Sequence, residues 1–136
     1  MISYETLFIV KPTLTEEEVA SEIERVQEIV TQEGGELEIV DRMGMRRLAY
    51  PIDKQERGYY VVIYFKAPSR LIAELERQLR YNENIMRFMT VKYSSKKEIA
   101  QFEKAVSAIR RKSGESKGEE NTEEVSVEES EANDSK

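Results

Sequence analysis

The stretch GMRRLAYPIDKQERGYYVVIYF, residues 44–65, decides the predicted fold of this 136-residue chain. Residues 59–65 are apolar or aromatic at every position, which predicts a central strand, because such a strand must be covered on both faces. The charged residues 53–58 predict a turn, and residues 36–52 predict the strand before it. Pro51 has no amide hydrogen to donate to a neighbour, so we expect that earlier strand at an edge of the sheet.

The apolar residues of segment 36–52 change face partway along it. Side chains alternate between the two faces of a strand, so a change of phase requires an irregularity. We expect a bulge or kink near residues 44–47. The odd-numbered set is Leu37, Ile39, Met43 and Met45, and the even-numbered set is Leu48, Tyr50 and Ile52.

The rest of the chain alternates between strand and helix patterns. Thr15 and Glu18 have the spacing of a capping box that begins a helix, and Gly34-Gly35 is typical of its end. Helical apolar spacing also follows Pro68-Ser69. The predicted order is strand 3–10, helix from residue 15, strand 36–52, strand 59–65, helix from residue 69, strand 85–93 and helix 95–112.

This β-α-β-β-α-β order predicts an α+β, ferredoxin-like sandwich. We expect a four-stranded antiparallel sheet with two helices on one face, over residues 1–95, and a C-terminal helical extension over residues 96–112. Residues 113–136 contain nine acids, two lysines and almost no large apolar side chain. Such a segment buries too little surface to offset its ordering entropy, so we predict a disordered acidic tail.

The formal net charge of −6 is unevenly distributed. Residues 1–40 contain two basic and ten acidic groups, whereas residues 41–112 contain 17 basic and eight acidic groups. The net charge of the whole chain therefore hides the strongly basic middle segment, because residues 1–40 and the acidic tail together outweigh it in the sum. The charge of the middle segment and that of the tail are best interpreted separately.

Several functional classes are disfavoured by composition. The chain has no cysteine and no histidine, which removes thiol chemistry, the usual general base and the commonest metal ligand. Enzyme activity is therefore disfavoured, although carboxylates, Lys, Arg and Ser could still support it, and we predict no cofactor and no metal. No signal peptide or membrane span is recognisable in the sequence, so we expect a cytoplasmic protein. A small enzyme binding phosphate through Arg80 with Asn82 or Asn84 is a weak alternative.

The middle segment has the composition of a nucleic-acid-binding surface. Basic side chains neutralise phosphates, and aromatic residues interleaved with them can stack on unpaired bases. The alternative is a set of solvated charges that pair with nearby acids. The adjacent Arg46 and Arg47 on a kinked edge strand favour binding, because at least one of them should point outward.

Residues 57–64, RGYYVVIY, partly match the consensus of RNA-recognition motifs. Tyr60 replaces a small residue, however, and Val61 replaces an aromatic residue that would stack on a base. We interpret this similarity as a shared central strand, with single-strand RNA binding as an alternative function. A ferredoxin-like module that binds a small regulatory ligand is another, although the sequence has no glycine-rich ligand loop.

Three longer motifs identify a family resemblance. YETLFIVKP at residues 4–12, GMRRLAYPIDKQERGYY at 44–60 and LERQLRYNENIMRFMTVK at 75–92 resemble the bacterial ribosomal small-subunit protein six family. The resemblance extends over residues 1 to about 95. It implies a non-catalytic protein that binds the central domain of small-subunit ribosomal RNA together with small-subunit protein eighteen.

The resemblance and the charge pattern together predict two sets of site residues. The predicted RNA-binding residues are Arg46, Arg47, Lys54, Arg57, Arg80, Arg87 and Lys92. The predicted contacts with the protein partner are Met43, Met45, Leu48 and Tyr50, where an extended segment would add to the edge strand. Leu48, Tyr50 and Ile52 could instead belong to the core, and the arginines could brace the fold.

Overall fold

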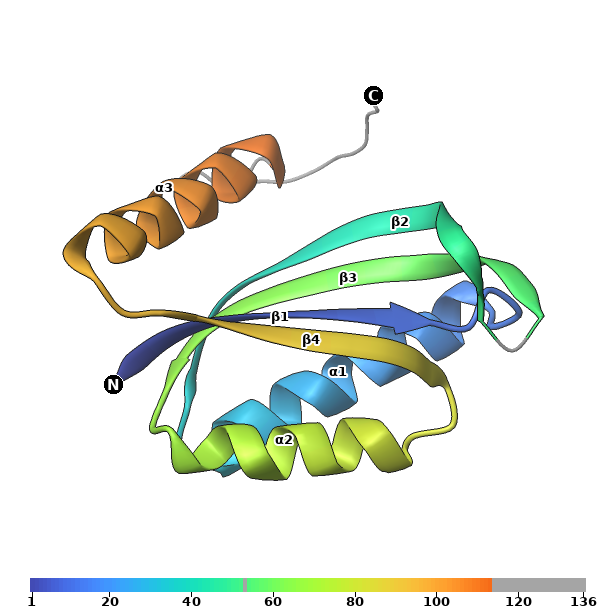
Figure 1. The fold of residues 1–136 in the computed structure, drawn as a ribbon, viewed down its shortest axis with the longest axis horizontal. Coiled ribbons are helices and arrows are strands. Elements are labelled where there is room, and N and C mark those ends of the chain that lie inside the picture. The colour runs from blue at the N-terminus through green and yellow to red at the C-terminus, as the bar shows by residue number, and fades with distance from the viewer. Residues whose placement is uncertain (53, 114–136) are drawn as a thin grey trace. The chain divides into compact units, whose positions relative to one another are not determined.

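The computed structural model describes residues 1–52 and 54–113, so all of the predicted tail beyond Ser113 lies outside the described residues. The chain divides after residue 95 into two compact units, Met1–Ser95 and a unit that begins at Lys96. The elements in chain order (Figure 1) are β1 (Ile2–Val10), α1 (Glu16–Gln32), β2 (Glu36–Ile52), β3 (Gln55–Ala67), α2 (Arg70–Tyr81), β4 (Ile85–Tyr93) and α3 (Lys96–Ser113).

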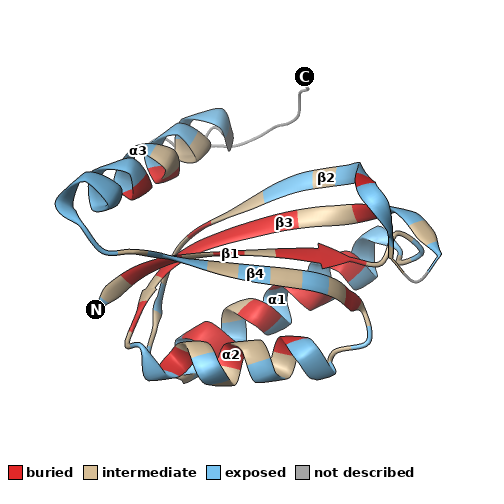
Figure 2. Ribbon diagram, viewed as in Figure 1, coloured by how far each residue is buried: buried red, intermediate tan, exposed pale blue. Residues whose placement is uncertain are grey.

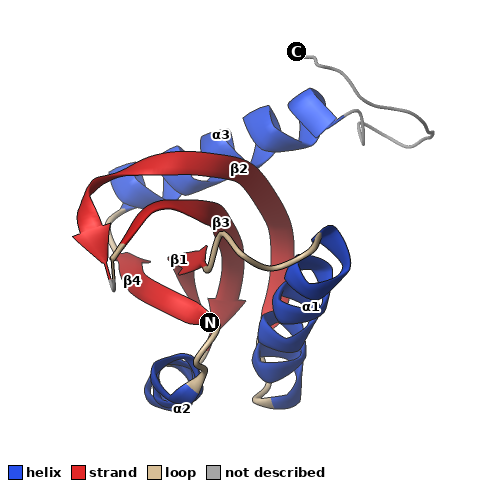
Figure 3. Cartoon of the chain, turned by 90° about the vertical axis from the view of Figure 1, so that its right-hand side faces the viewer, coloured by secondary structure: helices blue, strands red, loops and turns tan. Residues whose placement is uncertain are grey.

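The first unit is a four-stranded sheet with strand order β2-β3-β1-β4. All neighbouring strands are antiparallel. Helices α1 and α2 lie side by side on the same face of this sheet (Figures 1 and 3). This arrangement confirms the predicted ferredoxin-like α+β fold, with β3 inside the sheet and β2 at its edge.

The core lies between the sheet and the two helices. Residues Tyr4, Phe8 and Val10 of β1 alternate inward, as the period of two along a strand requires. Helix α1 buries Val19, Ile23, Val26, Ile29 and Val30, and helix α2 buries Leu71, Leu75 and Leu79. Figure 2 shows these stripes as the buried sides of both helices. Each fully buried side chain of this size stabilises the fold by about 1.5 to 3 kcal/mol.

Helix α1 begins and ends as its sequence predicts. The Glu18 amide donates to Thr15 Oγ1 over 3.1 Å, and the Thr15 amide donates to Glu18 Oε1 over 2.8 Å. The helix ends before Gly34, whose φ of 95° is readily adopted only by glycine. The capping box therefore sets the residue at which α1 begins, Glu16, after β1 has ended at Val10.

The hairpin formed by β2 and β3 differs from its prediction. Residues 55–58 belong to β3, so the predicted turn over 53–58 is too long. The pairing shifts register between Arg42 and Gly44 and again between Arg47 and Ile52, on both sides of the predicted irregularity at 44–47. In the second shift four residues of β2, 48–51, oppose Glu56 of β3, because Arg47 pairs with Arg57 and Ile52 with Gln55. Figure 3 shows both strands curving strongly along their length.

Helix α3 is amphipathic. Phe102 and Val106, one helical turn apart, are buried, whereas Ile99 is 39% exposed. Within the described part of the chain, none of the helices combines the length and hydropathy needed to cross a membrane.

Candidate nucleic-acid interface

The end of the β2–β3 hairpin brings two arginines opposite each other. Arg47 is the cross-strand partner of Arg57, and Arg46 is the partner of Gly58. Like charges placed directly opposite each other destabilise a strand pair. Glu56 Oε1 lies 3.8 Å from Arg47 Nη2, with both side chains at least 70% exposed. An ion pair this exposed contributes little, so among the described residues it leaves most of the positive charge of the Arg47–Arg57 pair in place.

Lys54 adds a further cation at the turn of the hairpin. Its φ is 67°, in the left-handed region where glycine and asparagine are the usual residues. A longer side chain in this region costs on the order of 1 kcal/mol or more. Its side chain is exposed. The turn thus has a positive charge at the position where the backbone would favour a small residue.

The base of the hairpin is fixed by close packing around Gly58. A Cβ at this glycine would lie 2.4 Å from Ile9 Cγ2, 3.6 Å from Leu48 Cδ2 and 3.7 Å from Met86 Sδ. Because Gly58 on β3 has no side chain, the side chains of Leu48 from β2, Ile9 from β1 and Met86 from β4 can lie close together around it. Leu48 is only 8% exposed. It supports the hairpin from inside, as the core alternative for this residue anticipated.

The core alternative also includes Tyr50 and Ile52, but these two residues are less buried than Leu48. Tyr50 is 68% exposed, and Ile52 has intermediate burial. The register shift explains the difference, because residues 48–51 have no regular pairing and so do not alternate between two faces. The core interpretation of Tyr50 is therefore wrong.

Strand β4 places the remaining predicted cations at the opposite edge of the sheet. Arg87 pairs with Ile9, whereas Lys92 pairs with Tyr4, so the two side chains lie on opposite faces about 17 Å apart along the strand. The Arg80 guanidinium, from the last turn of α2, lies 5.8 Å from the centroid of the Phe88 ring. A cation over a ring face is weakly attracted to it and still available to an anion.

The seven predicted RNA-binding residues therefore form two groups, all with exposed side chains. Arg46, Arg47, Lys54 and Arg57 form the hairpin group, and Arg80, Arg87 and Lys92 form the β4 group. Arg87 lies near the hairpin, because its partner Ile9 pairs with Tyr60, two residues after Gly58. Lys92 lies at the other end of the sheet. Arg42, by contrast, is held by Glu16 at 3.0 Å and by the Tyr59 hydroxyl at 3.1 Å.

Both edges of the sheet also expose apolar side chains. On β2, Met43 and Met45 of the predicted partner site are 36% and 41% exposed. On β4, Met89 and Val91 are 57% and 38% exposed, and the sequence prediction missed them. The alternation of Met89 and Val91 with Thr90 and Lys92 along a predicted strand could have identified them as an apolar face of this edge strand.

Two alternative functions lose their structural basis. The amides of Asn82 and Asn84 donate to the two carboxylate oxygens of buried Glu22, over 2.6 and 2.7 Å. They therefore do not form a phosphate site with Arg80. In the RNA-recognition-motif alignment the base-stacking positions fall on Tyr59 and Val61, but Val61 is fully buried in the core and Tyr59 packs against it.

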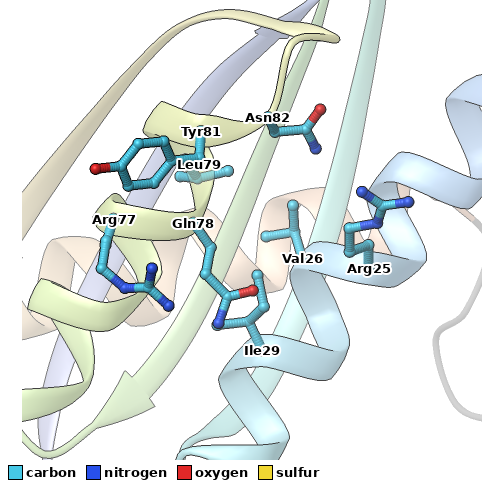
Figure 4. A pocket seen from close by; sticks show the side chains of 8 residues that line it. All are labelled: Arg25, Val26, Ile29, Arg77, Gln78, Leu79, Tyr81 and Asn82. Carbon is cyan, nitrogen blue, oxygen red and sulfur yellow. The ribbon is translucent and has the colours of Figure 1, made fainter.

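A shallow groove of about 210 Å³ lies between α1 and α2 (Figure 4). Val26, Ile29 and Leu79 line it, with Arg25 on one side and Arg77 on the other. Arg77 donates to both oxygens of Glu74, at 2.9 and 2.8 Å, and this pairing lowers the pKa of Glu74 to about 2. The lining includes no carboxylate and no thiol, so we find no acid–base pair in this groove.

The face of the sheet away from α1 and α2 contains one strongly shifted group. Burial raises the pKa of Tyr64 to about 12, and the negative charges of Glu5 and Asp41 add to the shift. Tyr64 is therefore a neutral phenol at any physiological pH. The described residues also contain no group of three or more side chains suited to holding a metal ion.

Comparisons with known proteins identify relatives over most of the chain. The family model described as ribosomal protein S6 matches residues 3–92. The chain is 57% identical over 123 residues to small ribosomal subunit protein bS6 of Campylobacter lari, covering 90% of this chain and 99% of that protein. It is 47% identical to the bS6 protein of a Nitratiruptor species, covering 88% and 93% of the two chains.

A solved structure extends the agreement to the fold. The crystal structure of 30S ribosomal protein S6 from Thermotoga maritima superposes with a TM-score of 0.68 at 34% sequence identity, covering 78% of this chain and 97% of that one. The family match over residues 3–92 and the structural match thus both point to the same family. The chain belongs to the ribosomal protein S6 family.

Proposed function

We propose that this chain binds the central domain of small-subunit ribosomal RNA through its two groups of exposed cations, together with small-subunit protein eighteen. As a member of the ribosomal protein S6 family, it is a structural constituent of the small ribosomal subunit in the cytoplasm. The family is structural, so the chain is not an enzyme, in agreement with the expectation from composition.

The observation that carries the RNA proposal is the opposed pair Arg47 and Arg57. Two cations held side by side on a hairpin, weakly paired with Glu56 in the described part of the chain, form a site that an anion stabilises. A phosphate of the RNA backbone supplies that charge and can accept hydrogen bonds from both guanidinium groups. Arg46 and Lys54 lie within the same hairpin and extend the positive surface, so that it can contact further phosphates of the RNA backbone.

The β4 group supplies a second line of contact along the other edge. Arg80 and Arg87 flank the start of β4, and Lys92 lies near its end. Contacts distributed over two edges, rather than in one pocket, suit the recognition of folded RNA by its shape. Duplex RNA hides its base edges in a deep, narrow major groove, so phosphate and sugar contacts position such a protein.

Small-subunit protein eighteen is proposed to dock at the β2 edge. Met43 and Met45 expose flexible apolar side chains beside a strand edge that has no neighbour in the sheet. An extended segment of the partner can add there through main-chain hydrogen bonds. Leu48 contributes indirectly, since it is buried and holds the hairpin in place.

Binding to a transcript of the RNA central domain, measured over a range of salt concentrations, tests the RNA proposal. Replacing Arg46 and Arg47 together by alanine should weaken binding and flatten the log–log salt dependence by about 0.7 to 0.9 for each lost phosphate contact. Arg77→Ala is the matched control, because Arg77 is equally a surface arginine but is already paired with Glu74. Removal of residues 114–136 should not weaken RNA binding.

Unchanged RNA affinity of the double variant would mean that these arginines are structural. The native protein should also sediment with small ribosomal subunits and be released by high salt. Recovery of the protein only as a free homodimer would contradict the proposed function.

The partner site has its own test in an RNA-free binding assay with small-subunit protein eighteen. Met45→Lys should weaken that association, because it places a charge on the docking edge. Met89→Lys is the control, since Met89 is more exposed but lies on the opposite edge strand. Equal losses in both variants, or a loss only in the control, would place the partner elsewhere.

A further inference from the structure

We propose that Tyr50 is a stacking platform for an unpaired base of the RNA, an inference that rests on the proposed function. The sequence predicts Tyr50 among the contacts with the protein partner. The structure separates it from the rest of that set, since Leu48 is buried and Tyr50 is 68% exposed. The ring thus lies on the hairpin end that also contains the opposed arginines.

The register shift displays the ring. Residues 48–51 oppose only Glu56, so this part of β2 loops out of the regular ladder. Within residues 1–52 and 54–113, the Tyr50 ring has no ring contact, ion pair or side-chain hydrogen bond. At 68% exposed, the ring can receive a base on its face without displacing a contact within the described chain.

The loop is held from both ends, which makes the ring an ordered surface. Leu48 is packed against the space above Gly58, near Ile9 and Met86. Pro51 follows Tyr50 and has a φ fixed near −65° by its ring. A side chain presented by a restrained backbone loses little conformational entropy on binding.

Positive charge around the ring favours a nucleotide over an apolar protein surface. The Cα atoms of Arg47 and Tyr50 are three residues apart and so lie within about 11 Å of each other. The next strand returns Arg57 to the position opposite Arg47. Phosphates flanking a base stacked on Tyr50 would lie within reach of these guanidinium groups. Stacking tolerates any base, since every base has a π-face, but it requires that the base be unpaired.

The experiment compares Tyr50→Leu, which keeps apolar bulk, with Tyr50→Phe, which keeps the ring. Binding of the full chain to the RNA central domain is measured with small-subunit protein eighteen present, across a salt series. We expect Tyr50→Leu to weaken binding about 5- to 150-fold. Tyr50→Phe should remain within about twofold of the unaltered protein, the range expected when stacking is retained. The log–log salt slope should not change, because no phosphate contact is removed.

Tyr81→Leu is the matched control. Tyr81 is 75% exposed but lies at the end of α2, outside the hairpin. Because both tyrosines are exposed, neither substitution should unfold the protein, and the thermal midpoint verifies this. Irradiation of the complex should also cross-link the peptide that contains Tyr50 to a nucleotide that is unpaired in the free RNA.

Four outcomes would overturn the inference. Full RNA affinity in Tyr50→Leu, or an equal loss in Tyr81→Leu, would show that the ring at position 50 makes no specific stacking contribution. Weaker binding of Tyr50→Leu to protein eighteen without RNA would assign the ring to the protein interface instead. Failure of the unaltered protein to bind the RNA would remove the proposed function as well, which distinguishes that failure from the other three.

Discussion

Replacing Gly58 by alanine should destabilise the hairpin by a collision that the structure locates. The added methyl group would lie 2.4 Å from Ile9 Cγ2. Non-bonded carbon atoms approach comfortably to about 3.5 to 4.0 Å, so one of the two strands must move by about 1 Å. Ile9 Cγ2 is fixed by the branch at its own Cβ, and the side chain is only 6% exposed, so it has little room to turn away.

The expected cost is the difference between two effects. Inserting a methyl group into a packed site costs about 1 to 3 kcal/mol. Replacing glycine by alanine also restricts the unfolded chain, which returns about 0.4 to 1 kcal/mol. The approach to 2.4 Å places the insertion in the upper part of its range, about 2 to 3 kcal/mol, so the free energy of unfolding should fall by about 1 to 2.6 kcal/mol. Displacement of Leu48 should follow, and with it weaker RNA binding by the hairpin cations.

A double-mutant cycle measured by urea denaturation identifies the cause. Ile9→Leu removes the branched methyl group, so Gly58→Ala should cost about 1 kcal/mol less in that background. Gly44→Ala is the control. It has a φ of 92° with no atom near its added Cβ, so its cost comes from backbone strain and should not couple to Ile9→Leu. An uncoupled cycle at Gly58, or an undiminished stability of Gly58→Ala, would refute the packing argument.

Three further substitutions test other parts of the fold. Glu22→Gln should lower the free energy of unfolding by about 1 to 3 kcal/mol, because an amide replaces one of the two oxygens that accept buried hydrogen bonds; exposed Glu24→Gln should change it by less than about 0.5 kcal/mol. Tyr64 has a pKa raised from 10.0 to about 12, so its contribution to stability is complete below pH 10 and is lost as the pH rises through 12. Denaturation at alkaline pH should show a smaller loss over that window in Tyr64→Phe, and equal losses would mean that another group titrates there. Arg77→Ala should raise the pKa of the Glu74 carboxyl group from about 2 toward 4.5, as followed by carboxyl chemical shifts, and an unmoved titration would assign the shift to another neighbour.

The fold follows from the sequence wherever local signals agree with each other. The capping box at Thr15 and the apolar load of residues 59–65 each have one structural reading, and the structure confirms both. The central position of β3 and the edge position of β2 follow from the same kind of argument. The β-α-β-β-α-β order of the six elements in the first unit then leaves few ways to build a sheet covered by two helices.

The hairpin shows where such reasoning ends. The change of apolar phase predicts an irregularity but not how many residues loop out, because register depends on cross-strand packing. Leu48 and Tyr50 have the same parity and opposite burial for that reason. The pairing of Arg47 with Arg57 likewise depends on the register and is invisible in the sequence. Glu22 could have been found, since it lies three residues after Val19 and four before Val26, on the buried stripe.

Charge segregation within the first unit has a kinetic consequence. Helix α1, on one face of the sheet, contains six glutamates and one arginine, whereas the hairpin and β4 display exposed arginines and lysines. A body charged in this way has a permanent electric dipole moment. The field of a polyanion exerts a torque on that dipole and rotates the cationic surface toward it before any atoms touch. Collisions that begin with the glutamate-rich helix in front would then be corrected in flight, and the capture rate would fall steeply as added salt shortens the range of the field.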